Sequence, residues 1–398
     1  METKQHMEFG LFFPPQHYPQ QNPTRALQRD LETIKFAERM GFTEAWVGEH
    51  HSSGWEIVSS PEVFVASAIE CTARIRLGTG VVSLPYHHPF HVASRAVLLD
   101  HLAQGRFMLG VGPGSLPSDA AMLGIPWSET RSRMVESFSA IHHLLTSQKP
   151  LTTTAKWFDL EDAVLQLRPY SLPTMPIVFT AMESPFGPSL AGKYGAGLIS
   201  LSATTASGYG ALNRHWTVVE EQADKHKQVV SRDDWRITVY MHVAETKDDA
   251  KRDVEKGLLR YTYYGAAVLE RTLEWWDPDG NASGPPPSVD QIIDTFGGMK
   301  IACVGTPKDA IDMIRALLDI TGGFGKLLIM AGIDWASQEA QNRSLELIAR
   351  EVMPHFEDST SSLVAAERRM QETRKSRIAE QRAAINAARE AYDAVQKR

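Results

Sequence analysis

Two adjacent histidines, His50 and His51, follow the short apolar run of residues 45–48. The run indicates a buried strand, because it comes soon after a helical pattern that stops at Gly41, a favourable residue for ending a helix. Parallel α/β folds gather catalytic groups at the C-terminal ends of their strands, where the connecting loops converge. An imidazole titrates near neutral pH and both donates and accepts hydrogen bonds, so this position suits proton transfer. The alternative is a histidine pair that only closes the strand.

A second candidate lies in residues 181–189, between an apolar run and a short predicted helix. Ser184, Gly187 and Ser189 would present hydroxyl groups and backbone N–H groups at the start of that helix, an arrangement that binds phosphate. Simple capping of the helix by Ser184 is the alternative. The glycines of residues 110–114 do not have the spacing of a dinucleotide-binding loop, so a tightly held NAD on a Rossmann unit is not expected.

Five histidines could in principle hold a metal ion. Adjacent histidines diverge at a strand end, however, and no Asp, Glu or His spacing completes a zinc or iron triad. We therefore predict no metal. The histidines concerned are His50, His51, His87, His88 and His91.

Strand-like and helical patterns alternate along most of the chain, which is typical of a parallel α/β fold. Eight such repeats predict a closed (β/α)8 TIM barrel over residues 1–358, with insertions near 150–172 and 267–300. Residues 359–398 contain neither Gly nor Pro and are rich in Ala, Arg, Glu, Gln and Lys, which indicates a helical or disordered extension. The predicted strands are residues 9–13, 45–48, 76–82, 107–112, 176–180, 197–201, 236–243 and 326–331.

The segment 267–300 is too long for a plain connection between a strand and a helix, and such loops often close over a binding site. It contains Trp275 and Trp276, which need somewhere to pack, and the proline run 285–287. We therefore predict a lid over the strand ends. A surface excursion without function is the alternative.

Composition narrows the class of protein. A formal net charge of −7 and a pI near 6.1 do not fit general binding to nucleic acid or anionic membranes, which needs a basic surface. Cys71 and Cys303 lie in apolar surroundings without metal-ligand spacing, as is typical of buried thiols in a reducing compartment. No window approaches about 18 uninterrupted apolar residues. We expect a cytoplasmic protein that does not cross a membrane.

Several short motifs occur in an order and spacing that resembles the bacterial luciferase-like flavin monooxygenases, from about residue 7 to residue 356. They lie at residues 49–51, 78–85, 88–89, 99–100, 105–107, 110–112, 183–184, 304–307 and 352–354. Within that superfamily, residues 184–188, 214–216 and 321–325 look most like the limonene-monooxygenase and diketocamphane-monooxygenase branch.

The resemblance implies roles for particular positions. His50 matches the family's active-site histidine beside the flavin ring. Glu183 and Ser184 match the pair on the phosphate side of the cofactor. Gly80–Val81 matches the place of a non-proline cis peptide bond under the ring.

Two positions depart from the family pattern. Gly112 stands where luciferase subunits carry a reactive cysteine, so light emission is not implied. Pro113 stands where they carry an arginine near the phosphate, so phosphate binding is expected to depend more on backbone donors.

The implied activity is that of an FMN-dependent, two-component monooxygenase. Reduced FMN would come from a separate flavin reductase, because the chain lacks a nicotinamide site, and would react with O2 to give a flavin hydroperoxide. One oxygen atom would then enter an apolar small molecule such as a terpene, a cyclic ketone or an aromatic compound. The alternatives are an F420-dependent hydride-transfer oxidoreductase of the same fold, which would need a more cationic lining, and a flavin-binding protein without turnover.

The residues expected to form the site fall into three groups, and His50 is the catalytic candidate. Contacts to the cofactor are expected from Glu49, Gly80, Val81, Gly112, Glu183, Ser184, Gly187, Ser200 and Leu201. The apolar candidates for the substrate pocket, which would also exclude water, are Phe12, Phe13, Trp55, Trp275 and Trp276. A homodimer or heterodimer through the barrel helices is expected as well.

Overall fold

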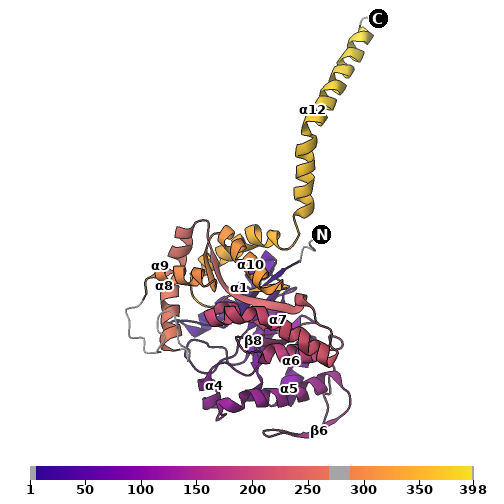
Figure 1. Cartoon of the computed structure of the whole chain (residues 1–398). Coiled ribbons are helices and arrows are strands. Elements are labelled where there is room, and N and C mark those ends of the chain that lie inside the picture. Colours follow the sequence, from indigo (N-terminus) through magenta and orange to yellow (C-terminus); the bar gives the residue numbers. More distant parts are fainter. Residues whose placement is uncertain (1–5, 269–286, 397–398) are drawn as a thin grey trace. The chain divides into compact units, whose positions relative to one another are not determined.

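The computed structural model describes residues 6–268 and 287–396, and within them eight parallel strands close into a barrel (Figure 1). β12 pairs with β1 along residues 326–330 and 8–12, which closes the ring. The predicted (β/α)8 fold is confirmed. In spatial order the strands are β1 (Glu8–Phe13), β2 (Glu44–Val47), β3 (Arg76–Thr79), β5 (Phe107–Gly112), β8 (Ile177–Ala181), β9 (Gly197–Ser200), β10 (Trp235–Val243) and β12 (Lys326–Met330).

Helices follow the barrel strands and surround the barrel (Figure 1). Proline stands in the first turn of several of them, where its missing N–H has no partner to lose. Gly41, Gly195 and Gly322 adopt the left-handed conformation that ends a helix. The helices are α1 (Pro23–Met40), α2 (Pro61–Cys71), α3 (Pro89–Leu102), α5 (Thr130–Thr146), α6 (Phe186–Tyr194), α7 (Ala206–His226), α8 (Lys247–Ala267), α10 (Pro307–Thr321) and α11 (Gln338–Leu347).

The third predicted strand, residues 76–82, is interrupted. β3 ends at Thr79, and the cis peptide bond Gly80–Val81 separates it from β4 (Val82–Ser83). The Thr79 hydroxyl donates to the Gly110 carbonyl at 2.8 Å and accepts from the Gly110 N–H at 3.0 Å. Hydrogen bonds of the Thr79 side chain thus replace the backbone hydrogen bonds between β3 and β5 at this point. An apolar run in the sequence could not indicate this break in the strand. The cis bond implied by the resemblance is confirmed.

The segment after α8 is more regular than the sequence pattern indicated. α9 (Val289–Gly298) begins with a capping box formed by Ser288 and Gln291, and its apolar face is buried. β11 (Ala302–Gly305) then pairs with the second half of β10. Residues 289–298 of the predicted lid, 267–300, are therefore a regular helix, and the role of the segment as a lid stays a prediction.

The rest of the predicted lid is outside the described residues. Trp275 and Trp276 belong to this part, so their assignment to the substrate pocket stays a prediction.

Two smaller elements complete the barrel unit. The insertion at 150–172 contains β6 (Leu151–Thr154) and β7 (Asp159–Ala163), an antiparallel hairpin beside α5 (Figure 1). α4 (Pro117–Met122) lies between β5 and α5 and was not indicated by the pattern.

Residues 354–396 form, with His6, a second compact unit. Its main element is α12 (Ser361–Gln396), a helix of 36 residues without a buried side chain. The predicted extension is therefore helical, as the lack of Gly and Pro favours. No helix among the described residues is long and apolar enough to cross a membrane.

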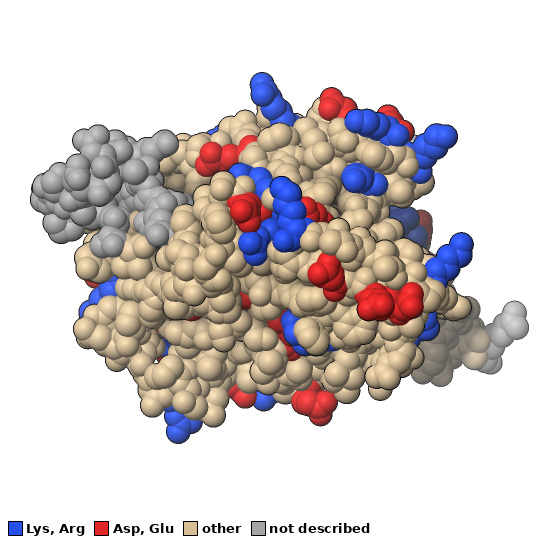
Figure 2. Space-filling view, turned by 90° about the horizontal axis from the view of Figure 1, so that it is seen from below, with Lys and Arg blue, Asp and Glu red and all other residues tan. Residues whose placement is uncertain are grey.

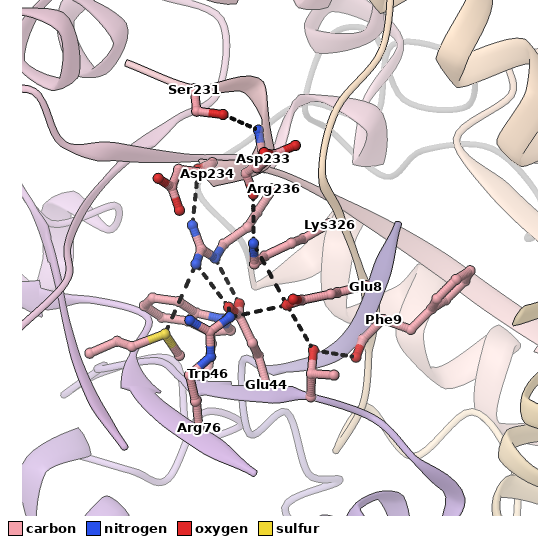
Figure 3. Close-up of polar contacts among 12 residues, drawn as sticks. Glu8, Phe9, Glu44, Trp46, Arg76, Ser231, Asp233, Asp234, Arg236 and Lys326 are labelled. Atoms are coloured by element: carbon pink, nitrogen blue, oxygen red, sulfur yellow. Dashed lines mark hydrogen bonds and ion pairs between the residues drawn. The ribbon is translucent and has the colours of Figure 1, made fainter. Parts of the chain in front are cut away.

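A buried cluster of charges occupies the N-terminal end of the barrel (Figure 3). The Glu44 carboxylate accepts hydrogen bonds from Arg236 Nε at 2.7 Å and Arg236 Nη2 at 2.8 Å. Arg76 and the Trp46 indole N–H donate to the same carboxylate. Burial by itself raises the pKa of Glu44, but Arg236, Arg76 and Lys326 outweigh burial and lower the pKa to about 2. Glu44 is therefore ionised throughout the neutral and mildly acidic range.

Loss of one partner is expected to cost less in an exposed ion pair than in this cluster. Figure 2 shows acidic and basic side chains interspersed over the face that it views. Pairs such as Arg133–Glu129 are solvated, and an exposed ion pair is worth about 0–1 kcal/mol. A buried charge that loses its partner costs about 3–5 kcal/mol instead.

We predict that Glu44→Gln lowers the free energy of unfolding by about 3–5 kcal/mol, because it leaves Arg236 buried without a full counter-charge. The folded-state pKa of Glu44 lies below its ordinary value of 4.5, so this contribution is present above pH 4.5 and is lost as the pH falls through about 2. Urea unfolding at about pH 7 and about pH 5 should therefore give similar losses. Glu129→Gln is the exposed control, and an equal loss in both variants would contradict the role of the cluster.

Candidate active site

A cavity of about 910 Å³ opens at the C-terminal end of the barrel. Phe12, Thr180 and Met330 line it, and each stands at or next to the last residues of its strand. Glu44 and Arg236 stand at the first or second position of theirs. The cavity and the buried charge cluster therefore occupy opposite ends of the barrel, in the usual division between chemistry and stability.

The lining changes character around the ring of strands. After β5, β8 and β9, which are neighbours, charged and hydroxyl-bearing side chains stand among apolar ones; we call this the polar end. Along β10, β12 and β1, also neighbours, and on α8 and α9 the lining is mainly apolar and aromatic; we call this the apolar end. The polar end comprises Arg131, Glu183, Ser184, Thr204, Thr205, Ala206 and Ser207. The apolar end comprises Phe12, Tyr240, Tyr261, Phe296, Met299, Ile301 and Met330.

His50 follows β2 and lines the cavity. Its Nδ1 lies 2.9 Å from Oδ2 of Asp119 on α4, and its Nε2 lies 3.5 Å from Oε2 of Glu56. Burial by itself lowers the pKa of His50, but the charge of Glu56 and the hydrogen bond with Asp119 outweigh burial and raise the pKa above its usual value. His50 therefore holds a proton more firmly than a free imidazole does.

Glu49 uses its carboxylate to hold neighbouring loops together. Oε1 lies 2.9 Å from Nε2 of His51 and 2.6 Å from Nε2 of His87, and Oε2 accepts from the Ser83 N–H at 2.7 Å. Burial raises the pKa of Glu49, but the hydrogen bonds from the two histidines outweigh burial and lower it. Among the described residues, no three His, Cys, Asp or Glu side chains are arranged to hold a metal ion.

Two helices begin at the polar end, α6 at Phe186 and α7 at Ala206. The first N–H groups of a helix carry partial positive charge and bind anions well. Arg131 adds a full positive charge and is the one Lys or Arg among the described residues that line the cavity. Its guanidinium carbon lies 5.9 Å from the centre of the Phe186 ring, which places it beside the start of α6.

Gly187 allows α6 to approach the end of β8. A Cβ at this position would lie 1.9 Å from the Thr180 carbonyl oxygen, so any other residue would push the helix away. The helix start therefore stays at the cavity wall. The Ser207 hydroxyl donates to Glu183 at 2.5 Å and so joins the starts of α6 and α7.

Most of the described residues in the predicted site line one cavity. They are Phe12, Glu49, His50, Gly80, Val81, Glu183, Ser184, Gly187 and Leu201. Phe13, Trp55, Gly112 and Ser200 do not line it.

Two of these four residues, Phe13 and Ser200, stand near strand ends with their side chains directed away from the cavity. Phe13 follows Phe12 in β1, and successive side chains of a strand point to opposite faces. The Ser200 hydroxyl is fully buried, where it accepts from the Trp235 indole N–H at 2.9 Å and lies 3.0 Å from Nδ1 of His215. The Ser200 side chain therefore does not line the cavity, and its expected contact with a cofactor stays a prediction.

Packing explains the other two. The Trp55 ring packs on Tyr264, with ring centres 4.7 Å apart, and is almost completely buried. A Cβ at Gly112 would lie 2.7 Å from the Val81 side chain, so Gly112 supports Val81 instead of facing the cavity. Gly112 therefore packs behind the cavity wall, against Val81, and Trp55 packs on Tyr264 outside the lining.

Five lining or contacting residues were not indicated by the sequence pattern. Glu56 and Asp119 flank His50, Arg131 lies at the polar end, and Tyr261 and Phe296 come from helices. Two of them had a signal in the sequence: Glu56 follows His50 in the same loop, and Phe296 lies in the segment 267–300 predicted to cover the strand ends. The others reach the cavity through tertiary packing.

The chain matches the family model of the luciferase-like monooxygenases over residues 7–322. It is 46% identical over 350 residues to limonene 1,2-monooxygenase of Rhodococcus erythropolis, covering 88% of this chain and 87% of that protein. It is 43% identical over 362 residues to 4-hydroxyprotoasukamycin monooxygenase of Streptomyces nodosus subsp. asukaensis, covering 90% of this chain and 95% of that one.

A solved structure is also similar, that of the oxygenating constituent of 3,6-diketocamphane monooxygenase from Pseudomonas putida in complex with FMN. The TM-score is 0.73 at 26% identity, covering 88% of this chain and 98% of that chain. The resemblance inferred from the short motifs is thus confirmed. The sequence match and the fold together place this chain in the family of luciferase-like monooxygenases.

Proposed function

We propose that the protein is an FMN-dependent monooxygenase, the oxygenating component of a two-component system, acting on an apolar small molecule. The observation that carries the proposal is a single cavity with two helix starts and an arginine at one end, an apolar wall at the other and a histidine held by carboxylates. The solved relative that binds FMN is itself named an oxygenating constituent, which supports a separate reductase as the partner.

The residues of the polar end fit the phosphate of FMN. The starts of α6 and α7, the hydroxyl of Ser184 and the guanidinium of Arg131 can donate hydrogen bonds on that side. The flat ring needs a wall that it can approach closely, and Gly80 lines the cavity without a side chain; packing requires glycine there, since a Cβ would lie 2.9 Å from the Phe12 ring. A cavity of about 910 Å³ is at the large end for a small-molecule site.

The apolar end fits a terpene, a cyclic ketone or an aromatic compound. Phe296, Met299 and Ile301 offer apolar surface, and the hydroxyls of Tyr240 and Tyr261 hydrogen-bond to each other. Such a wall keeps water away from the reacting groups.

Reduced FMN, when bound, supplies the two electrons that convert one atom of O2 to water while the other atom enters the substrate. Atoms balance: reduced FMN, O2 and substrate give FMN, water and the oxygenated product. The residues of the chain would bind and orient the cofactor and the substrate and keep water out of the cavity. His50 would hold or release a proton at Nε2.

We predict that the protein, supplied with FMN and a reductase, converts a member of a panel of terpenes, cyclic ketones and aromatic compounds. Under ¹⁸O2 the product should contain one labelled oxygen atom, as mass spectrometry would measure. Reduced F420 without FMN serves as the comparison. Product formation with F420 alone, or no product from any member of the panel, would contradict the proposal.

We predict that His50→Ala lowers product formation by about 10²-fold, the effect of losing an acid–base residue, while FMN still binds. His91→Ala is the control, because His91 is exposed on α3 and does not line the cavity. Steady-state product analysis would measure the rates. Unchanged turnover in His50→Ala would refute the assigned role.

We predict that Arg131→Met weakens FMN binding about tenfold or more, because a charge-assisted hydrogen bond to phosphate is lost. Riboflavin, which has no phosphate, should bind equally well to both forms. Arg133→Met is the matched control, since Arg133 lies on the same helix but pairs with Glu129 outside the cavity. Flavin fluorescence titration would measure the dissociation constants, and an equal loss for riboflavin would remove Arg131 from the phosphate site.

A further inference from the structure

The loop after β2 turns back on itself and brings a second carboxyl group to His50. The His50 N–H donates to the Val58 carbonyl at 3.0 Å, which closes the loop. The His17 N–H donates to the Trp55 carbonyl at 2.9 Å and fastens the loop to the segment after β1. Glu56 is thereby held beside the imidazole, where it lines the cavity.

The two oxygens of the buried Glu56 carboxyl have different neighbours. Oε1 accepts from Gln16 Nε2 at 3.0 Å. Oε2 lies 3.5 Å from Nε2 of His50, longer than a usual hydrogen bond but close enough for strong attraction between opposite charges in a buried site. A buried carboxylate is unfavourable without such a partner.

The other ring nitrogen of His50, Nδ1, is hydrogen-bonded to Asp119. Asp119 accepts hydrogen bonds from the His51 N–H at 3.0 Å and from the Ser52 hydroxyl at 2.5 Å, besides its contact with Nδ1 of His50. Burial raises the pKa of Asp119, but the hydrogen bonds from His50 and Ser52 outweigh burial and lower it. An ionised carboxylate only accepts, so Nδ1 carries a hydrogen. Nε2 is then the nitrogen that gains and loses a proton.

The surroundings of the pair are acidic. Burial by itself raises the pKa of Glu56, and the positive charge of His50 opposes that effect without reversing it. The groups that face His50 or Glu56 are Glu49, His51, Asp119, Gln16 and, from α8, Tyr264.

We propose that Glu56 is a positioning residue for His50: its carboxyl group keeps a proton on Nε2, the nitrogen that lies beside it. Asp119 sets which nitrogen titrates, and Glu56 sets how firmly that proton is held. In turnover the Nε2 proton passes to an oxygen atom in the cavity and is replaced from solvent, while Glu56 itself gives up no proton. This role in turnover rests on the proposed oxygenase function, but the effect on His50 belongs to the protein alone.

The first test is the titration of His50 in the protein without added flavin, followed by long-range ¹H–¹⁵N NMR. Glu56→Gln keeps the size of the side chain and its contact with Gln16 but removes the charge, so the pKa of His50 is expected to fall. Glu62→Gln is the matched control, because Glu62 is also buried but pairs with Arg95 at 3.0 Å away from the cavity. It should leave the pKa of His50 unchanged.

The wild-type protein supplies a second measurement that needs no variant. Throughout the titration Nδ1 should keep its hydrogen, and Nε2 should gain and lose one. A titrating Nδ1, or an unchanged pKa of His50 in folded Glu56→Gln, overturns the proposal. Should Glu56→Gln fail to fold, the pKa of His50 in Glu56→Asp decides: the shorter side chain moves the charge away from Nε2, so an unchanged pKa would overturn the proposal.

The second test is turnover. Glu56→Gln is expected to lower kcat about tenfold with little change in KM, as for partial loss of an acid–base group. The fall of kcat at alkaline pH should move to lower pH, because a His50 of lower pKa loses its Nε2 proton earlier. Glu56→Asp, which keeps the charge, should recover part of the rate.

A lower kcat with an unmoved pH profile would mean that Glu56 only supports the loop, and would overturn the proposal. The expected NMR result in a wild-type protein that oxygenates nothing would instead overturn the proposed function and leave the effect of Glu56 on His50 standing.

Discussion

The ion pair between Glu44 and Arg236 fills the N-terminal end of the barrel interior, and the side chains nearer the cavity pack on it. The Arg236 guanidinium carbon lies 5.2 Å from the centre of the Trp46 ring, which fills the middle of the barrel. Gly78 leaves room for that ring, since a Cβ there would lie 2.3 Å from it. A Cβ at Gly80 would lie 3.1 Å from Cβ of Trp46, so the cavity wall rests directly on the tryptophan. A charge pair at one end thus supports the surface proposed to carry the flavin ring at the other.

The loops above the barrel are held by a second buried charge cluster. His17 lies 2.8 Å from Asp30 of α1 and 3.4 Å from Asp334, which follows β12. Burial by itself lowers the pKa of His17, but the two carboxylates outweigh burial and raise the pKa to about 9. The imidazolium joins the loops after β1 and β12 at neutral pH. Gln16, its neighbour, therefore presents its amide to Glu56 from a rigid backbone, as a preorganised site requires.

The sequence predicted what depends on local pattern. The barrel strands are buried runs, and most strand-end candidates line one cavity because parallel strands finish at the same end. Phe13 and Ser200 were misplaced because pleat and twist, which an apolar run does not record, decide which side chain faces inward at a strand end. Asp119 and Arg131 could not be found because they arrive from helices, whose position over the barrel is a property of the packed structure.

The proposed function requires one cavity to bind an anion at one place and to hold a proton at another. The phosphate is proposed to bind at the polar end, where the starts of α6 and α7 and the guanidinium of Arg131 lie together with Glu183. A proton is favoured at His50, where carboxylates surround the imidazole. If Arg131 stood among those carboxylates, it would pair with them, lower the proton affinity of the histidine and no longer be offered to a phosphate. The strands β5 and β2, which lead to Arg131 and His50, are separated by β3, and this separation lets both charges persist.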